Sequence, residues 1–159
     1  MKMEKKNLDW GNLGFGYMTT DYRYVANYKD GKWDDGALVT DPTVTLNECA
    51  GVFQYSQSCF EGLKAYTTED GHIVCFRPDL NAVRMMDSAK RLEMPPFPAE
   101  RFLEAVEEVV KANAAWVDEM TVVPLLVRFQ FHSRLGCRGK AILQYLAIYR
   151  NRNVRPTGR

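Results

Sequence analysis

Two groups of side chains in this sequence have the types and spacing to bind a small molecule. The first is the stretch from Val52 to Tyr66, in which Tyr55 and Phe60 stand among small and amide side chains just before Gly62. Aromatic rings give a ligand apolar contact area, and a glycine lets the backbone bend beside them. The stretch therefore predicts one wall of a small-molecule pocket.

The second group is the polar face of a helix that the sequence predicts from Pro78, since proline is favoured at the first helical position. Asn81, Arg84, Ser88 and Arg91 recur along it at intervals of three and four residues. Arg84 is the chemical candidate, because its planar guanidinium with five donors matches a phosphate or a carboxylate. From the spacing alone, a solvated surface arginine is the simpler interpretation.

Two weaker candidates accompany these groups. Phe15 stands between two glycines, a pattern typical of a turn that enters a strand and also of an aromatic ring presented to a ligand. His72 follows a turn signal, and no acid or thiol is patterned beside it. We expect His72 to be a solvent-exposed residue and not a catalytic one.

The elements that must position these residues follow from periodicity and turn signals. An Asp-Gly pair within 29–32 predicts a hairpin turn, and Glu-Asp-Gly at 69–71 predicts a second one. The expected strands are 17–28, 33–40, 63–67, 72–76 and 121–127, and the expected helices are 46–61, one from Pro78, and 99–115. Two hairpins interleaved with three helices predict an α+β fold, a small two-layer domain with helices packed on a mostly antiparallel sheet.

Composition is that of an ordinary globular chain. It has 159 residues, 46% of them hydrophobic and 26% charged, and a net charge of +1. The N-terminus is charged without a following apolar core, and no apolar run approaches the ~20 residues that a membrane span needs. The four cysteines lack the close spacing of a metal site, so we expect free thiols, no metal and a cytoplasmic protein.

Several motifs resemble those of the branched-chain amino acid aminotransferases. They are Phe15-Gly16 followed by Asp21, Tyr55-Ser-Gln-Ser-Cys-Phe-Glu-Gly-Leu-Lys-Ala-Tyr66, Phe76-Arg-Pro-Asp-Leu-Asn-Ala-Val-Arg-Met85 and Ser88-Ala-Lys-Arg-Leu-Glu-Met-Pro95. The likeness runs from about Leu13 to about Val123 in the family's order and spacing. It implies the pyridoxal-phosphate fold of the D-amino acid aminotransferase type, in which a small N-terminal α+β domain precedes a larger C-terminal one and the cofactor lies between them.

The resemblance also implies an activity and a set of roles. The activity is pyridoxal 5'-phosphate-dependent transfer of the amino group of Leu, Ile or Val to 2-oxoglutarate, in both directions, by a homodimer. By position, Arg84 matches the arginine that binds the cofactor phosphate, and Phe15, Tyr55 and Phe60 match the aromatic side of the substrate pocket. Such a wall separates substrates that differ by one methylene by only ~1–3 kcal/mol, so the three amino acids are not ranked. A lyase or D-amino acid aminotransferase of the same fold is the alternative within this class.

The family's Schiff-base lysine belongs to the C-terminal domain, as do the acid facing the pyridine nitrogen and most of the phosphate-binding loop. Neither Lys64 nor Lys140 stands in the context of that lysine. We therefore expect a truncated chain that contains no catalytic residue of its own and is inactive alone.

The likeness stops after Pro124, close to a change in charge. Residues 128–159 hold eight of the 21 Lys and Arg and none of the 20 acids. We expect an N-terminal extension over 1–12, the small aminotransferase domain over 13–124, and an irregular basic tail over 125–159. The hypothesis for that tail is a shifted reading frame or a misjoined gene.

The residues leave two other classes of function open. Aromatic residues are interleaved with the basic ones in the tail, a combination that can contact nucleic acid or an anionic membrane surface. The other class is a non-catalytic domain that binds a ligand or pairs with a full-length subunit.

Overall fold

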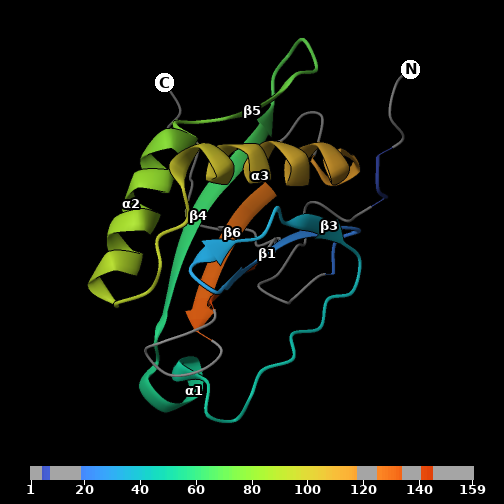
Figure 1. The fold of residues 1–159 in the computed structure, drawn as a ribbon. Helices are drawn as coiled ribbons and strands as arrows, with labels where there is room; N and C mark the ends of the chain where they lie inside the picture. The colour runs from blue at the N-terminus through green and yellow to red at the C-terminus, as the bar shows by residue number, and fades with distance from the viewer. Residues whose placement is uncertain (1–4, 8–18, 118–124, 134–140, 145–159) are drawn as a thin grey trace.

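The computed structural model describes residues 5–7, 19–117, 125–133 and 141–144, the last two segments as backbone strands. An antiparallel sheet forms one layer, and the two long helices cover one of its faces (Figure 1). The elements are β1 (Arg23–Lys29), β2 (Lys32–Trp33), β3 (Ala37–Val39), α1 (Gly51–Tyr55), β4 (Ser58–Thr67), β5 (Ile73–Cys75), α2 (Pro78–Arg91), α3 (Ala99–Ala112), a 3-10 turn (Ala114–Trp116), β6 (Leu125–Ser133) and β7 (Ala141–Gln144). The predicted α+β class is confirmed.

Both hairpins expected from turn residues are present. β1 pairs with β2 across Asp30 and Gly31, which have φ of 53° and 84°, as this tight turn requires. β4 pairs with β5 in the register Ala65↔Cys75, so the chain reverses through the predicted second turn. Along the path of the described strands, the order is β2-β1-β7-β6-β4-β5, and β3 also pairs with β1.

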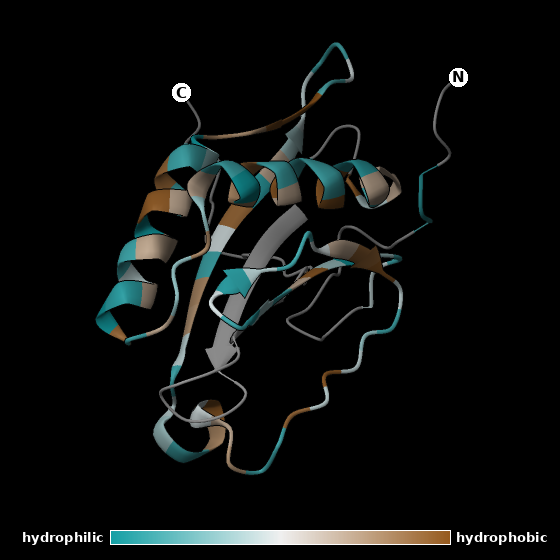
Figure 2. Cartoon of the chain, viewed as in Figure 1, coloured by the Kyte–Doolittle hydropathy of each residue, from teal (hydrophilic) through white to brown (hydrophobic). Residues whose placement is uncertain are grey.

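The two long helices follow their predicted periodicity. α2 starts at Pro78 and buries Ala82, Met85 and Ala89, while α3 buries a stripe that begins at Phe102. Hydrophilic and hydrophobic residues alternate along both helices (Figure 2), as expected of helices that cover a sheet on one side. These stripes pack on the inner side chains of β1 and β4 to form the core.

The helix predicted over 46–61 is wrong over most of its length: residues before Gly51 are irregular, and from Ser58 the chain is strand β4. Only Gly51–Tyr55 is helical, and this short helix ends at Ser56, whose φ of 50° is left-handed. β4 then pairs with β6 in register from Ser58↔His132 to Ala65↔Leu125. The apolar spacing of this stretch fits a helix locally, but long-range pairing decides the conformation in favour of the sheet.

The C-terminal segments also differ from the expected irregular tail. β6 lies between β4 and β7, and β7 pairs with β1 in the register Val25↔Gln144. The backbone of 125–133 and 141–144 therefore joins the two halves of the sheet and supplies hydrogen-bonding partners to β4 and β1. Within the described residues, no helix combines the length and hydropathy that crossing a bilayer requires.

Candidate anion-binding site

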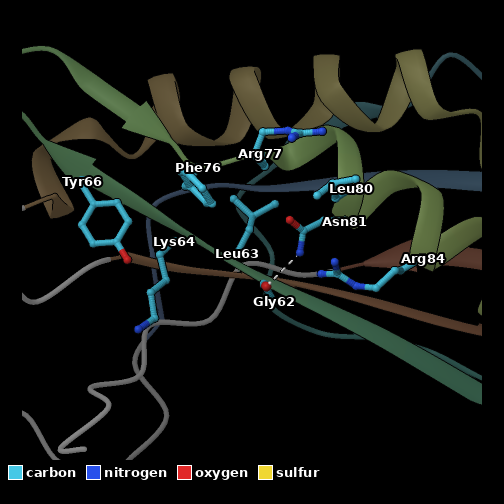
Figure 3. Close-up of a pocket in the computed structure, with 9 residues that line it drawn as sticks. All are labelled: Gly62, Leu63, Lys64, Tyr66, Phe76, Arg77, Leu80, Asn81 and Arg84. Atoms are coloured by element: carbon cyan, nitrogen blue, oxygen red, sulfur yellow. Dashed lines mark hydrogen bonds between the residues drawn. The ribbon is translucent and has the colours of Figure 1, made fainter. Parts of the chain in front are cut away.

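A pocket of about 310 Å³ lies where the backbone of β4 leaves its partner β5 and passes α2 (Figure 3). β5 pairs with β4 only over Ala65–Thr67, so the earlier residues of β4 face α2 on this side. The pocket is lined by Gly62, Leu63, Lys64, Tyr66, Phe76, Arg77, Leu80, Asn81 and Arg84. It thus brings together part of the Val52–Tyr66 stretch and the polar face of α2.

The pocket lining carries basic side chains and no acid. Lys64, Arg77 and Arg84 are its charged members, and Leu63, Tyr66, Phe76 and Leu80 supply apolar area. Arg77 is paired with Asp79 at 2.7 Å, and Lys64 extends away from α2 (Figure 3). A lining of this kind suits an anion attached to an apolar or aromatic body.

Arg84 is held in a planar double hydrogen bond. Its Nε donates to Glu61 Oε1 at 3.0 Å, and its Nη2 donates to Glu61 Oε2 at 2.9 Å. These hydrogen bonds and the charge of Glu61 raise the pKa of the Arg84 guanidinium. The pair with Glu61 uses two of the five N–H donors of the guanidinium, which leaves three for a ligand.

Asn81 completes this cluster from one turn earlier on α2. Its side chain is buried, and its Nδ2 donates to Glu61 Oε2 at 2.8 Å and to the carbonyl oxygen of Gly62 at 3.0 Å. No role was predicted for Glu61, and Asn81 was placed on the polar face of the helix without an assigned function. Their signal was present in the sequence, since both stand inside the quoted motifs, but only the packing of α2 on β4 shows that they touch.

The predicted aromatic wall lies away from this pocket. Tyr55 ends α1 and is 82% exposed, and Phe60 in β4 is 65% exposed. Neither residue is among those that line the pocket with Arg84. Phe60 precedes Glu61 in a strand, so the two side chains leave β4 on opposite faces. Phe15, the third aromatic residue of the predicted wall, lies outside the described residues.

Asp21, a residue of the quoted motifs, has a structural role, and His72 lies on the surface. Asp21 accepts hydrogen bonds from Lys6 Nζ and Trp116 Nε1, both at 3.1 Å. Partial burial acts to raise the pKa of Asp21, but these hydrogen bonds outweigh it and lower the pKa. His72 is exposed as predicted, but the expectation that no acid accompanies it was wrong, because its Nε2 lies 3.6 Å from Asp70 Oδ2.

A larger pocket of about 720 Å³ lies between the β4–β5 hairpin and α3. Its lining is mainly apolar, with Ile73, Val106 and Val110 among its members, and it contains none of the predicted binding residues. Among side chains that the structure describes, no three His, Cys, Asp or Glu gather as a metal site would, and Cys49, Cys59 and Cys75 are free thiols.

Comparison with known proteins explains why these motifs occur together. No protein-family model matches the chain. Over 112 residues, 70% of the chain, it is 55% identical to the branched-chain-amino-acid aminotransferase of Haemophilus influenzae. Over this segment the chain is a relative of the branched-chain aminotransferases. It is also 43% identical over 112 residues to a methionine aminotransferase of Arabidopsis thaliana.

Solved aminotransferases share the fold. The branched-chain aminotransferase of Thermoproteus uzoniensis, solved with norvaline, superposes with a TM-score of 0.62 at 25% identity over 84% of this chain and 41% of that one. The branched-chain aminotransferase of Thermobaculum terrenum, solved in its PLP form, gives a TM-score of 0.60 at 16% identity over 82% of this chain and 40% of that one. The chain spans about a third of the length of the curated branched-chain aminotransferases that it matches (33% of the Haemophilus protein).

Proposed function

We propose that this chain forms the small domain of a pyridoxal 5'-phosphate-dependent branched-chain-amino-acid aminotransferase. The observation that carries the proposal is the 55% identity over 112 residues to the Haemophilus enzyme, a segment that includes the pocket and its arginine. The fold of the described residues agrees with it, since solved members of this enzyme class superpose on the chain.

Arg84 is the residue that holds the cofactor phosphate in this proposal. The fit rests on the donor set: three free N–H groups on a partly exposed guanidinium, beside a lining with further basic residues and no acid. A phosphate dianion matches that donor set better than a neutral ligand does. Pyridoxal phosphate, when bound, supplies the electron sink for moving an amino group between a branched-chain amino acid and a 2-oxo acid.

The aromatic residues serve substrate selection in the same proposal. Tyr55 and Phe60, together with Phe15, line the side of the cleft that accepts the aliphatic side chain. The high exposure of Tyr55 and Phe60 agrees with a wall that other parts of the enzyme cover, either the remaining two thirds of the sequence or a second subunit. Because a relative is named a methionine aminotransferase, the apolar wall does not fix which amino acid is preferred.

The activity of the whole enzyme requires more than these residues. The chain spans a third of its relatives, and we propose that turnover, the homodimer and the cofactor-linking lysine depend on the part that it does not match. A cytoplasmic location is part of the proposal. The 159-residue chain alone is expected to show no transamination of leucine, isoleucine or valine.

The origin of residues 125–159 is a separate proposal. The abrupt loss of acids after Pro124 supports a shifted reading frame or a misjoined gene, although the backbone of 125–133 still pairs with β4. Sequencing the locus tests this. An intact frame, without an aminotransferase continuation in any other frame downstream, would rule it out.

The phosphate-binding role of Arg84 is tested by comparing pyridoxal 5'-phosphate with pyridoxal in titration calorimetry of the chain. We expect the phosphorylated compound to bind more tightly, and we expect Arg84→Ala to abolish that preference. Arg91→Ala, on the same helix but outside the pocket lining, is the matched control and should retain it. A preference that survives Arg84→Ala contradicts the role. Leucine transamination by the isolated chain, with a borohydride-fixed adduct on one defined lysine, contradicts the need for the rest of the enzyme.

A further inference from the structure

Arg84 does not stand alone beside the pocket, and the groups that hold it are less exposed than it is. The Glu61 side chain is 13% exposed, whereas that of Arg84 is 57% exposed. In an ion pair between such partners, the more buried carboxylate is the fixed member and the long, exposed arginine is the member whose orientation is set.

Glu61 is itself fixed by Asn81. The Asn81 amide donates to Glu61 Oε2 at 2.8 Å and to the backbone oxygen of Gly62 at 3.0 Å, so one side chain ties α2 to both the carboxylate and the strand. Its position in the core, 5% exposed, leaves it little freedom to rotate. The two carboxylate oxygens of Glu61 therefore receive three hydrogen bonds from two residues one helical turn apart.

The geometry of the Arg84–Glu61 contact selects one orientation. Two parallel N–H···O bonds fix the plane of a guanidinium, whereas a single ionic contact does not. Occupying Nε and one side of Nη2 leaves the opposite edge of the guanidinium, with Nη1, for an anion. An arginine already held in place loses less conformational freedom when the anion binds.

We propose that Glu61, held by Asn81, is the positioning residue that orients Arg84 toward a phosphate group in this pocket. The proposal rests on the phosphate-binding role of Arg84 given above. The carboxylate of Glu61 repels an anion. In this proposal, the affinity gained by orienting Arg84 is larger than the affinity lost through that repulsion.

The test measures phosphate binding and arginine order in the same chain. Inorganic phosphate and pyridoxal 5'-phosphate are titrated into the wild-type chain, Glu61→Ala, Glu61→Gln, Arg84→Ala and Asp79→Ala, and the arginine Nε–H signals are followed by NMR. We expect Glu61→Ala to weaken phosphate binding about five- to tenfold, as loss of a single oriented charge-assisted hydrogen bond does. Glu61→Gln should fall between Glu61→Ala and wild type, because the amide oxygen still accepts one hydrogen bond. The slowly exchanging Arg84 Nε–H signal should be lost in Glu61→Ala.

Asp79→Ala controls for charge, since it removes a carboxylate that pairs with another arginine of the pocket. It should bind phosphate at least as tightly as wild type. The positioning role is overturned if Glu61→Ala and Glu61→Gln bind phosphate as tightly as wild type while Arg84→Ala does not bind it. That result leaves the phosphate-binding role of Arg84 intact. If Arg84→Ala binds phosphate like wild type, both proposals fail. Glu61→Gln is isosteric, so it decides the question if Glu61→Ala does not fold.

Discussion

Asn113 and Tyr22 lie 91 residues apart in the chain and are joined by two hydrogen bonds. The backbone N–H of Tyr22 donates to Asn113 Oδ1 at 3.1 Å, and Asn113 Nδ2 donates to the Tyr22 carbonyl at 2.9 Å. Asn113 is fully buried, and its Nδ2 also donates to Val109 O at 2.9 Å. A side-chain amide thus acts as a strand partner and fastens the end of α3 to the chain that enters β1.

Replacing Asn113 with alanine should lower the free energy of unfolding by about 2–3 kcal/mol, because the partly buried backbone N–H and carbonyl of Tyr22 lose their partners and the fully buried side chain of Asn113 is removed. Urea unfolding followed by circular dichroism measures this. Glu104→Ala, an exposed position on the same helix, should change stability by less than about 0.5 kcal/mol. Equal midpoints for the two variants would contradict the structural role of Asn113.

Two glycines with positive φ should respond differently to alanine. At Gly31, with φ of 84° and no neighbour within 4 Å of an added Cβ, Gly31→Ala should cost about 1–2 kcal/mol from backbone strain alone. At Gly36, with φ of 72°, the added Cβ would overlap the hydroxyl group of Tyr24.

Tyr24 is buried, and its hydroxyl group donates a hydrogen bond to Asp35 O at 2.9 Å. If the ring moves, it loses this hydrogen bond and its packing contacts. Gly36→Ala should therefore cost about 1–3 kcal/mol more than Gly31→Ala. Thermal unfolding of the two variants side by side is the measurement. A smaller loss in Gly36→Ala than in Gly31→Ala would show that Tyr24 moves freely.

Phe97 connects the segment before α3 to the first hairpin. It is 1% exposed, its ring meets Trp33 edge-on at 4.9 Å, and the Arg101 guanidinium lies 5.0 Å from its centre. Phe97→Ala should destabilise the chain by about 3–5 kcal/mol through lost contacts and a cavity. Phe97→Leu keeps much of the volume and should cost less. Chemical denaturation with Trp33 fluorescence reports both, and equal losses would argue against a packing role.

Cys59 should make stability depend on alkaline pH. Burial, with a smaller contribution from the charge of Glu61, raises the pKa of its thiol from 9.0 to about 11. The unfolded chain therefore releases this proton earlier than the folded chain does. The stabilisation is fully present below pH 9 and is lost as the pH rises toward 11, by at most about 1.4 kcal/mol per pH unit.

The control for this effect is Cys59→Ala, in which the slope of unfolding free energy against pH should be shallower between pH 9 and 11. Tyr24, whose pKa is also raised by burial, titrates in both chains and cancels in the comparison. Identical slopes for the two chains would mean that the Cys59 thiol ionises as it does in the unfolded state.

Local chemistry predicted the elements that short-range interactions specify. The Asp30-Gly31 turn, the start of α2 at Pro78 and the buried stripe of α3 follow from positive φ, a fixed proline φ and a period of about 3.6 residues. Several motifs in the family's order and spacing, the one around Arg84 among them, indicated the family, and identity to known enzymes confirms that relationship.

Tertiary structure decided what depends on pairing between distant segments. The stretch that contains Phe60 has an apolar spacing compatible with a helix, and only its ladder with β6 makes it a strand. The same ladder draws 125–133 into the sheet, although basic composition there predicted an irregular tail.

The partner of Arg84 was decided in the same way. Glu61 is 23 residues away, and it reaches Arg84 because strand alternation turns its side chain toward α2 while Phe60 faces the other side. Residue types and local spacing thus determined which side chains are available for binding, because local conformational preferences depend on only a few neighbouring residues. The orientation of the Arg84 and Glu61 side chains depends on the packing of β4 against α2, a long-range arrangement that no local pattern specifies.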